Sequence, residues 1–268
     1  MQGPRPGVNV LRLVDQPRPL AWWAMRPFSH RYRIQYEARD LPDWQRIVLR
    51  RSVYVPDLKL LYVINAKAAS SSLRDMMFVL GGGSREAGPG RGLCFPTPRW
   101  REIAAAWTDP AVYRFTVGRH PVSRAVSAFN NLFVNHNNGF EWRHTPYMRR
   151  TGLKFGDGSA ANFDRFLDYV EEVQWESELF CDTHLRLQTH NVGARHIAYA
   201  RIGAYESLRT DVAEIMRGAG VGSYVPSALG WDNKARRDIA WSPDPSQVER
   251  IEAIYREDYE RFGYARTP

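Results

Sequence analysis

The chain has 268 residues, of which 44% are hydrophobic, 13% aromatic and 25% charged. This composition suits one large domain or two small ones around a substantial core, and it excludes a wholly disordered chain. The net charge of +8 favours an anionic partner, such as a nucleotide, an acidic glycan, a nucleic acid or an anionic membrane.

The beginning of the chain is predicted to be a partly ordered arm over residues 1–50, ahead of a single domain over residues 51–268. Residues 1–30 are rich in proline and arginine, and Trp22 and Trp23 lie among them. This composition indicates irregular structure that aromatic side chains order in part.

The location of the protein is predicted from what the sequence lacks. It has neither a signal-peptide core nor an apolar run of 18 residues. Cys94 and Cys181 lack the spacing of a metal site or a disulfide framework, so two free thiols are expected. We therefore expect a cytoplasmic protein without a transmembrane segment, and a peripheral membrane contact stays open.

The predicted elements alternate along the chain. Short apolar runs predict strands at 60–64, 112–117 and 197–202, and periodic apolar residues predict helices at 71–80, 99–107, 122–133, 163–173, 207–217 and 245–262. This alternation indicates an α/β fold with a central, mostly parallel sheet flanked by helices. Ligands bind such folds at the carboxyl ends of the strands, so the loops after Ile64 and Val117 are the predicted binding loops.

The loop after the first predicted strand has the composition of an anion site. Small residues Ala68 and Ala69 let the backbone approach a ligand, and Ser70, Ser71 and Ser72 bring hydroxyl groups to the start of a helix. Lys67 adds a positive charge, and it is one of only four lysines in the chain. The alternative from this segment alone is an ordinary strand-to-helix turn with serine caps.

The loop after the second predicted strand repeats this arrangement with arginines. Arg119 leaves the strand, Pro121 opens a helix, and Arg124 and Ser127 follow on it. Such spacing can bring a guanidinium and a hydroxyl to one phosphate group. The alternative is a helix start that is rich in arginine only because the whole chain is.

These residues resemble the nucleotide-binding motifs of sulfotransferases that use the sulfate donor PAPS (3′-phosphoadenosine 5′-phosphosulfate). Residues 67–72 resemble the 5′-phosphosulfate loop, with Ala66 where the family often has proline. Residues 119–129 resemble the 3′-phosphate motif. Further segments resemble the carbohydrate sulfotransferases of Golgi-type and bacterial origin, known as family 2: residues 162–167, 175–206 and 255–264.

The resemblance implies a P-loop-like fold and transfer of a sulfuryl group from PAPS to a hydroxyl or amine, most simply of a carbohydrate, without a metal. Lys67 would neutralise charge on the departing phosphate, and the 68–72 backbone would hold the 5′-phosphate. Arg119 and Ser127 would hold the 3′-phosphate, with Arg124 as a further candidate.

The general base of the transfer has two candidates. Glu86 lies in a glycine-rich loop, where some branches of the family keep a catalytic glutamate. His184 would project together with Arg186 and Gln188 from a strand or extended loop. A loop charge and a structural histidine, respectively, are the alternatives for these two residues.

Two other functions compete with sulfuryl transfer. A P-loop-like phosphotransferase would share the strand–loop–helix cradle, but the Walker A order of residues does not occur here. A non-catalytic protein that binds nucleotides, PAPS or nucleic acid would also suit the charge, although interleaved aromatic and basic residues for nucleic acid are not evident. The acceptor and the oligomeric state are left open.

Overall fold

The computed structural model describes residues 9–10, 19–82, 100–135, 141–176, 181–222 and 239–266. Its contacts divide the chain into two compact units. Unit 1 comprises residues 1–118 and 188–232, and unit 2 comprises residues 119–187 and 233–268.

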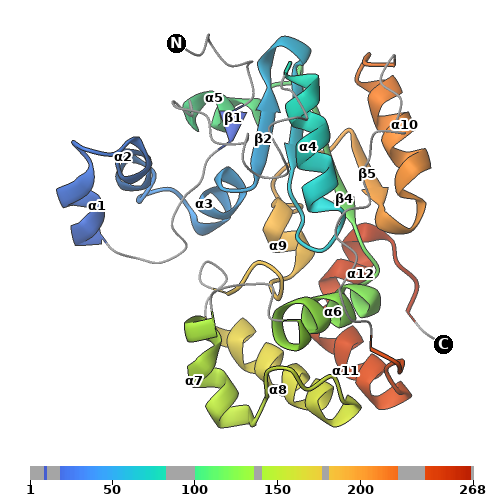
Figure 1. The fold of residues 1–268 in the computed structure, drawn as a ribbon. Helices are drawn as coiled ribbons and strands as arrows, with labels where there is room; N and C mark the ends of the chain where they lie inside the picture. The colour runs from blue at the N-terminus through green and yellow to red at the C-terminus, as the bar shows by residue number, and fades with distance from the viewer. Residues whose placement is uncertain are drawn as a thin grey trace. The chain divides into compact units, whose positions relative to one another are not determined.

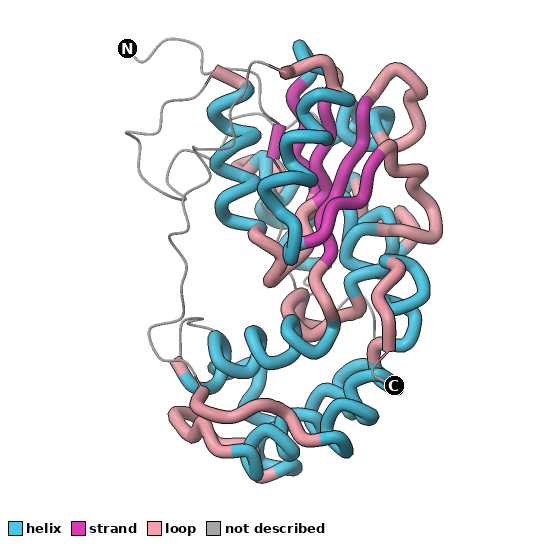
Figure 2. The backbone as a smooth tube through the Cα atoms, turned by 90° about the vertical axis from the view of Figure 1, so that its right-hand side faces the viewer, coloured by secondary structure: helices cyan, strands magenta, loops and turns pink. Residues whose placement is uncertain are grey.

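Unit 1 is built on a five-stranded sheet in the order β1-β2-β3-β4-β5 (Figures 1 and 2). The strands are β1 (Asn9–Val10), β2 (Ser52–Val55), β3 (Leu60–Val63), β4 (Tyr113–Gly118) and β5 (Arg201–Ala204). β3, β4 and β5 are parallel to one another, whereas β1 and β2 add an antiparallel edge. The predicted α/β fold with parallel central strands is thus confirmed, and the antiparallel edge was not predicted.

Helices cover both faces of this sheet. α4 (Ser70–Leu80) and α10 (Leu208–Gly218) pack on one face, where the alternate residues Leu60 and Tyr62 of β3 join the core. α5 (Trp100–Ala106) contacts β2 and α3 (Asp43–Leu49), and α3 contacts α9 (Gln188–Val192). The intervening residues of β3, Leu61 and Val63, are fully buried, as a strand covered on both faces requires.

The first fifty residues contain more structure than the predicted arm. α1 (Pro19–Met25) and α2 (His30–Glu37) lie side by side, and α3 follows them. Ile47, Val48 and Leu49 are fully buried, so the last turn of α3 belongs to the core of unit 1. The prediction of irregular structure over residues 1–30 is therefore wrong for residues 19–25.

The described part of unit 2 contains helices joined by turns and no strand. Its helices are α6 (Pro121–Phe129), the π-helical turn η3 (Asn130–Val134), α7 (Glu141–Thr151), α8 (Ala160–Glu176), α11 (Pro245–Ile254) and α12 (Arg256–Phe262). Phe129 and Phe133 pack against Phe163 and Phe166 at the centre of its core. The predicted helix at 245–262 is divided at Tyr255, which lies between α11 and α12 and is buried.

The third predicted strand is displaced along the chain. β5 begins at Arg201, and its pairing with β4 runs from Arg201 opposite Phe115 to Ala204 opposite Gly118. Residues 197–200 precede the strand, and the Tyr199 hydroxyl donates to the carbonyl of Val192. That bond holds Tyr199 back toward α9, so the apolar run at 197–202 is only partly a strand.

Candidate functional site: two helix starts and an aspartate–histidine pair

The loop after β3 is anchored by Asn65. Its side chain is fully buried, and Nδ2 donates to the carbonyl oxygen of Val117 at 3.0 Å and to Oε1 of Gln188 at 2.8 Å. These two bonds connect the end of β3 to the end of β4 and to the start of α9. The loop at 66–69 therefore leaves from a fixed point at the carboxyl edge of the parallel strands.

The loop itself has an uncommon backbone. Lys67 and Ala69 have φ angles of 67° and 56°, the left-handed region that non-glycine residues rarely adopt. Each such residue costs about 1–2 kcal/mol, so the surrounding structure must hold the loop in this shape. Left-handed residues that alternate with right-handed ones turn successive N–H groups to one side and form an anion-binding concavity.

The start of α4 completes the positive character of this loop. Ala69 occupies the N-cap position without a side-chain cap, and no acidic residue lies in the first turn. Ala68 is fully buried beside Leu73, whereas Lys67, Ser70, Ser71 and Ser72 are partly exposed. The helix dipole and Lys67 thus bring positive charge to the same turn.

Arg74 is a charged neighbour of the loop that the sequence reasoning missed. Its Nε donates to the carbonyl oxygen of Ser70 at 3.2 Å, and its Nη2 lies 3.5 Å from Oγ of Ser71. A guanidinium one turn after the loop adds a second cation to it. The spacing of four residues from Ser70, which places both on one helix face, was the available signal.

The start of α6 holds the second predicted motif. Arg119 Nε donates to Oγ of Ser123 at 3.1 Å, and that hydroxyl donates to the carbonyl oxygen of His120 at 3.0 Å. Pro121 occupies the first turn, which contains no acidic residue. Ser127 lies one turn after Ser123 and is partly exposed, so a guanidinium and two hydroxyls follow one side of the helix.

The C-terminal segment of unit 2 fixes this helix start. The ring of His120 lies 5.4 Å from the rings of both Tyr259 and Tyr264, edge-on to each. Tyr259 belongs to α12, and Tyr264 follows Gly263, which ends that helix with a left-handed φ of 71°. The terminal segment that resembles the carbohydrate sulfotransferases therefore packs against the residue next to Arg119.

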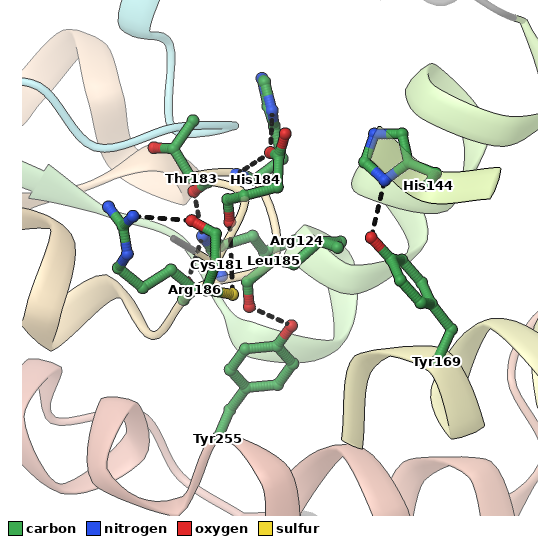
Figure 3. A network of polar contacts seen from close by, with 10 residues as sticks. Arg124, His144, Tyr169, Cys181, Thr183, His184, Leu185, Arg186 and Tyr255 are labelled. Atoms are coloured by element: carbon green, nitrogen blue, oxygen red, sulfur yellow. Dashed lines mark hydrogen bonds and ion pairs between the residues drawn. The ribbon is translucent and has the colours of Figure 1, made fainter. Parts of the chain in front are cut away.

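Arg124 is placed differently from the prediction. Only 1% of it is exposed, and its Nη2 donates to the carbonyl oxygens of Arg186 at 2.8 Å and Thr183 at 3.2 Å. Its guanidinium also lies over the ring of Tyr255 (Figure 3). Arg124 therefore anchors the 181–186 segment inside unit 2. Arg119 and Ser127 remain the candidates for the predicted phosphate contact.

The 181–186 segment forms a tight turn that presents His184. Arg186 Nη2 donates to the carbonyl oxygen of Cys181 at 2.6 Å, and the Tyr255 hydroxyl donates to that of Leu185 at 2.9 Å (Figure 3). Cys181 is a buried free thiol. The prediction that His184, Arg186 and Gln188 project together from an extended segment is wrong. The side chains of Arg186 and Gln188 are buried and form hydrogen bonds inside the protein.

His184 is paired with Asp182. Oδ1 of Asp182 accepts hydrogen bonds from Nδ1 of the His184 ring at 2.7 Å and from its backbone N–H at 2.8 Å. Burial would raise the pKa of Asp182, but the electrostatic interaction with His184 and these hydrogen bonds outweigh it and hold that pKa well below its usual range. The ionised carboxylate keeps the ring hydrogen on Nδ1 and leaves Nε2 to accept a proton.

Two residues named from the sequence, Glu86 and Cys94, lie outside the described residues. A cavity of about 590 Å³ lies at the amino ends of β3 and β4, opposite to Lys67, and is lined by residues that include Lys59, Tyr113 and Arg114. Within the described ranges, no group of three histidine, cysteine or acidic side chains could hold a metal ion, and no helix is long and apolar enough to cross a membrane.

Comparisons with known proteins relate the chain to carbohydrate sulfotransferases. It is 27% identical to carbohydrate sulfotransferase 10 of Gallus gallus over 57% of this chain and 46% of that protein. It is 26% identical to carbohydrate sulfotransferase 11 of Rattus norvegicus over 66% of this chain and 55% of that protein. The chain thus spans about half the length of these curated relatives. No solved structure matches.

The match to a family model extends much further along the chain. Residues 50–265 match the model described as the Sulfotransferase family. This range contains the Lys67 loop, the Arg119 helix start, the Asp182–His184 pair and the terminal helices. The chain therefore belongs to the sulfotransferase family.

Proposed function

We propose that the protein transfers a sulfuryl group from PAPS to a hydroxyl group of a carbohydrate and releases 3′-phosphoadenosine 5′-phosphate (PAP). The observation that carries this proposal is the strained loop at Lys67, where two left-handed residues and an uncapped helix start gather N–H groups beside a lysine. Family membership and the names of the relatives support the reaction and the class of acceptor.

The residues of the Lys67 loop fit a phosphosulfate group. The backbone of residues 68–72 would donate hydrogen bonds to the 5′-phosphate, and Lys67 would neutralise the charge that develops on the oxygen between phosphorus and sulfur as the bond from sulfur to that oxygen breaks. Arg74 would add a positive charge from the next turn of α4. Positioning and charge stabilisation of this kind account for most of the catalysis in the closely similar phosphoryl transfer.

The residues at the start of α6 fit a second phosphate group. Arg119 would donate to the 3′-phosphate with its guanidinium, and Ser127 with its hydroxyl. Ser123 accepts a hydrogen bond from Nε of Arg119 and so holds this guanidinium at the start of α6. The proposed nucleotide carries one phosphate group at its 5′ position and one at its 3′ position, and each helix start has the residue types that suit one of them.

His184 would act as the general base of the transfer. Its Nε2 would accept the proton of the acceptor hydroxyl as the acceptor oxygen bonds to sulfur. Asp182 would orient the ring and stabilise the imidazolium that forms. Glu86 is the competing candidate from the sequence.

The test uses two lysines at opposite ends of β3. Lys67→Ala should lower sulfate transfer from radiolabelled PAPS to a panel of glycans by about 100-fold or more, because a cation at the departing oxygen is lost. Lys59→Ala is the matched control, since Lys59 also has a left-handed φ but lies at the other end of the strand. Unchanged transfer by Lys67→Ala would contradict the proposal.

A binding experiment separates this proposal from a phosphotransferase. We expect calorimetry to detect PAP binding to the unmodified protein in the presence of EDTA, whereas a phosphotransferase of the P-loop type needs Mg²⁺ at its phosphates. Binding of ATP with Mg²⁺ but not of PAP would favour the phosphotransferase. PAP binding without transfer to any glycan would favour a non-catalytic protein.

A further inference from the structure

The exposed large hydrophobic side chains are concentrated in one short segment. Within the described residues, five such side chains are exposed, and four of them lie between residues 20 and 28: Leu20 (83% exposed), Trp23 (55%), Met25 (43%) and Phe28 (82%). We call these four side chains the apolar patch. Single exposed hydrophobic residues are ordinary, but a cluster of this kind marks a surface that contacts something else.

The apolar patch belongs to the helical hairpin formed by α1, α2 and the turn between them. α1 contacts α2, and the turn between them is closed by bonds from the N–H groups of Phe28 and Ser29 to the carbonyl oxygen of Met25. Among the side chains of this segment that the structure describes, Ile34 and Ala38 are the buried apolar ones. A helix of seven residues is too short to be stable alone, so exposing its apolar side chains is costly unless a partner covers them.

Arginines accompany the apolar patch. The Arg26 guanidinium lies 5.7 Å from the ring centre of Trp23 and 4.9 Å from that of Tyr36. Arg39 lies 3.8 Å from the same tyrosine ring and pairs with Asp40, and Arg33 is exposed. Two guanidinium groups thus share one aromatic ring at the edge of the patch.

The charge of the surrounding sequence has the same sign. Residues 1–37, up to the end of α2, contain six arginines, one aspartate and one glutamate, so about a seventh of the chain carries four of its eight net positive charges. Apolar and aromatic side chains beside arginines are the composition of helices that lie in the interface of a membrane. Anionic lipid headgroups attract such a segment by charge, and the membrane interior accepts its apolar side chains.

We propose that the α1–α2 hairpin docks the protein on an anionic membrane surface. Leu20, Trp23 and Phe28 enter the boundary between headgroups and acyl chains, and Arg26 and Arg33 contact lipid phosphates. A second copy of this chain is a poorer occupant, because a stable protein interface takes about 20–30 residues a side and the patch offers four. The proposal concerns the hairpin alone and does not depend on the proposed sulfate transfer.

The first experiment measures co-sedimentation of the full chain with lipid vesicles. Vesicles of phosphatidylcholine with about a third of phosphatidylglycerol should retain the protein, and pure phosphatidylcholine should retain much less. Binding should weaken as salt rises, because the headgroup attraction is screened. Equal sedimentation with both kinds of vesicle, or with neither, would overturn the proposal.

Variants then test which side chains are responsible. The double variant Trp23→Gln and Phe28→Gln should reduce vesicle binding by about tenfold or more, since two large apolar side chains are lost from the interface. Arg33→Gln should reduce binding severalfold and make it less sensitive to salt. Ile202→Gln is the control, because Ile202 is exposed on β5 and lies outside the hairpin.

Two further measurements test whether the double variant folds and whether the patch joins two copies of the chain. The melting temperature of the double variant should match that of the unmodified chain, because both replaced side chains are more than half exposed. Sedimentation velocity of both proteins without lipid tests self-association. If the unmodified chain self-associates, the double variant does not, and both bind vesicles equally, the patch is an interface between copies and the membrane proposal is wrong.

Discussion

Oδ1 of Asp182 lies 2.7 Å from Nδ1 of His184 in a turn that buried hydrogen bonds hold in place. Arg124 donates to the carbonyl oxygens of Thr183 and Arg186 on this turn. A histidine oriented by a carboxylate at one ring nitrogen can accept a proton at the other. His184 is therefore the general-base candidate that the described residues support.

We expect His184→Gln to lower kcat for sulfate transfer about 100-fold, because a general base contributes at least that factor. Its affinity for PAP should stay unchanged, since no nucleotide contact is assigned to His184. His196→Gln is a matched control on another histidine, whose ring stacks on Trp44. If Glu86→Gln abolishes transfer and His184→Gln does not, Glu86 is the base instead.

The Asp182 carboxylate should make stability depend on pH. Its pKa is lower in the folded protein than in the unfolded chain, so it stabilises the fold above the unfolded pKa of about 3.9, and this contribution is lost as pH falls toward the folded pKa. Asp182→Asn should therefore reduce the free energy of unfolding at pH 7 by about 1–3 kcal/mol. Urea titrations should show the difference shrinking below about pH 4.

A control for Asp182 lies in the same unit. Asp168 pairs with Arg250 but is half exposed, so Asp168→Asn should change stability by less than about 1 kcal/mol at pH 7. Equal losses in the two variants would mean that the buried hydrogen bonds of Asp182 contribute nothing beyond a surface ion pair.

The two arginines of the second motif should separate binding from stability. Arg119→Ala should weaken PAP binding about 10- to 100-fold and leave the melting temperature nearly unchanged, because its side chain is partly exposed and donates to a partly exposed serine. Arg124→Met should reduce the free energy of unfolding by about 3 kcal/mol, because two carbonyl oxygens lose a buried donor. Calorimetry measures PAP binding, and thermal melts measure stability. A loss of stability in Arg119→Ala together with a loss of PAP binding alone in Arg124→Met would contradict the positions given to the two arginines.

The backbone of the Lys67 loop can be tested with neighbouring alanines. Ala69→Gly should raise the free energy of unfolding by up to about 1 kcal/mol, because glycine relieves the left-handed strain at this position. Ala68→Gly should lower it by about 1–2 kcal/mol, because a fully buried methyl group is lost at a position where φ is not positive. Equal losses in the free energy of unfolding of the two variants would contradict a left-handed φ at Ala69 alone of these two alanines.

The sequence predicted best the features that depend on the types of a few neighbouring residues. Lys67 with its following small residues, and Arg119 with Pro121 and Ser127, predicted anion sites at two strand ends, and the structure places both segments at helix starts without acidic residues. Helix starts and strand ends are local, because they follow from the side chains of one segment and its backbone hydrogen bonds.

The sequence did not predict features that depend on packing between distant segments. The displacement of β5 depends on the bond from Tyr199 to Val192, and the burial of α3 depends on its contacts with α5 and α9. Likewise, the exposure of Trp23 and Phe28 depends on the packing of the folded chain, which hydrophobicity alone cannot indicate.

The sequence by itself determined the family-specific loops and the alternation of strands and helices. Only the tertiary structure decided that Arg124 is an interior anchor while Arg119 stays at the helix start, because two arginines five positions apart look alike until burial separates them. It also decided that Asp182 orients His184. A hydrogen bond between residues two positions apart needs a turn, and here Arg124 and Tyr255, from other parts of the chain, stabilise that turn.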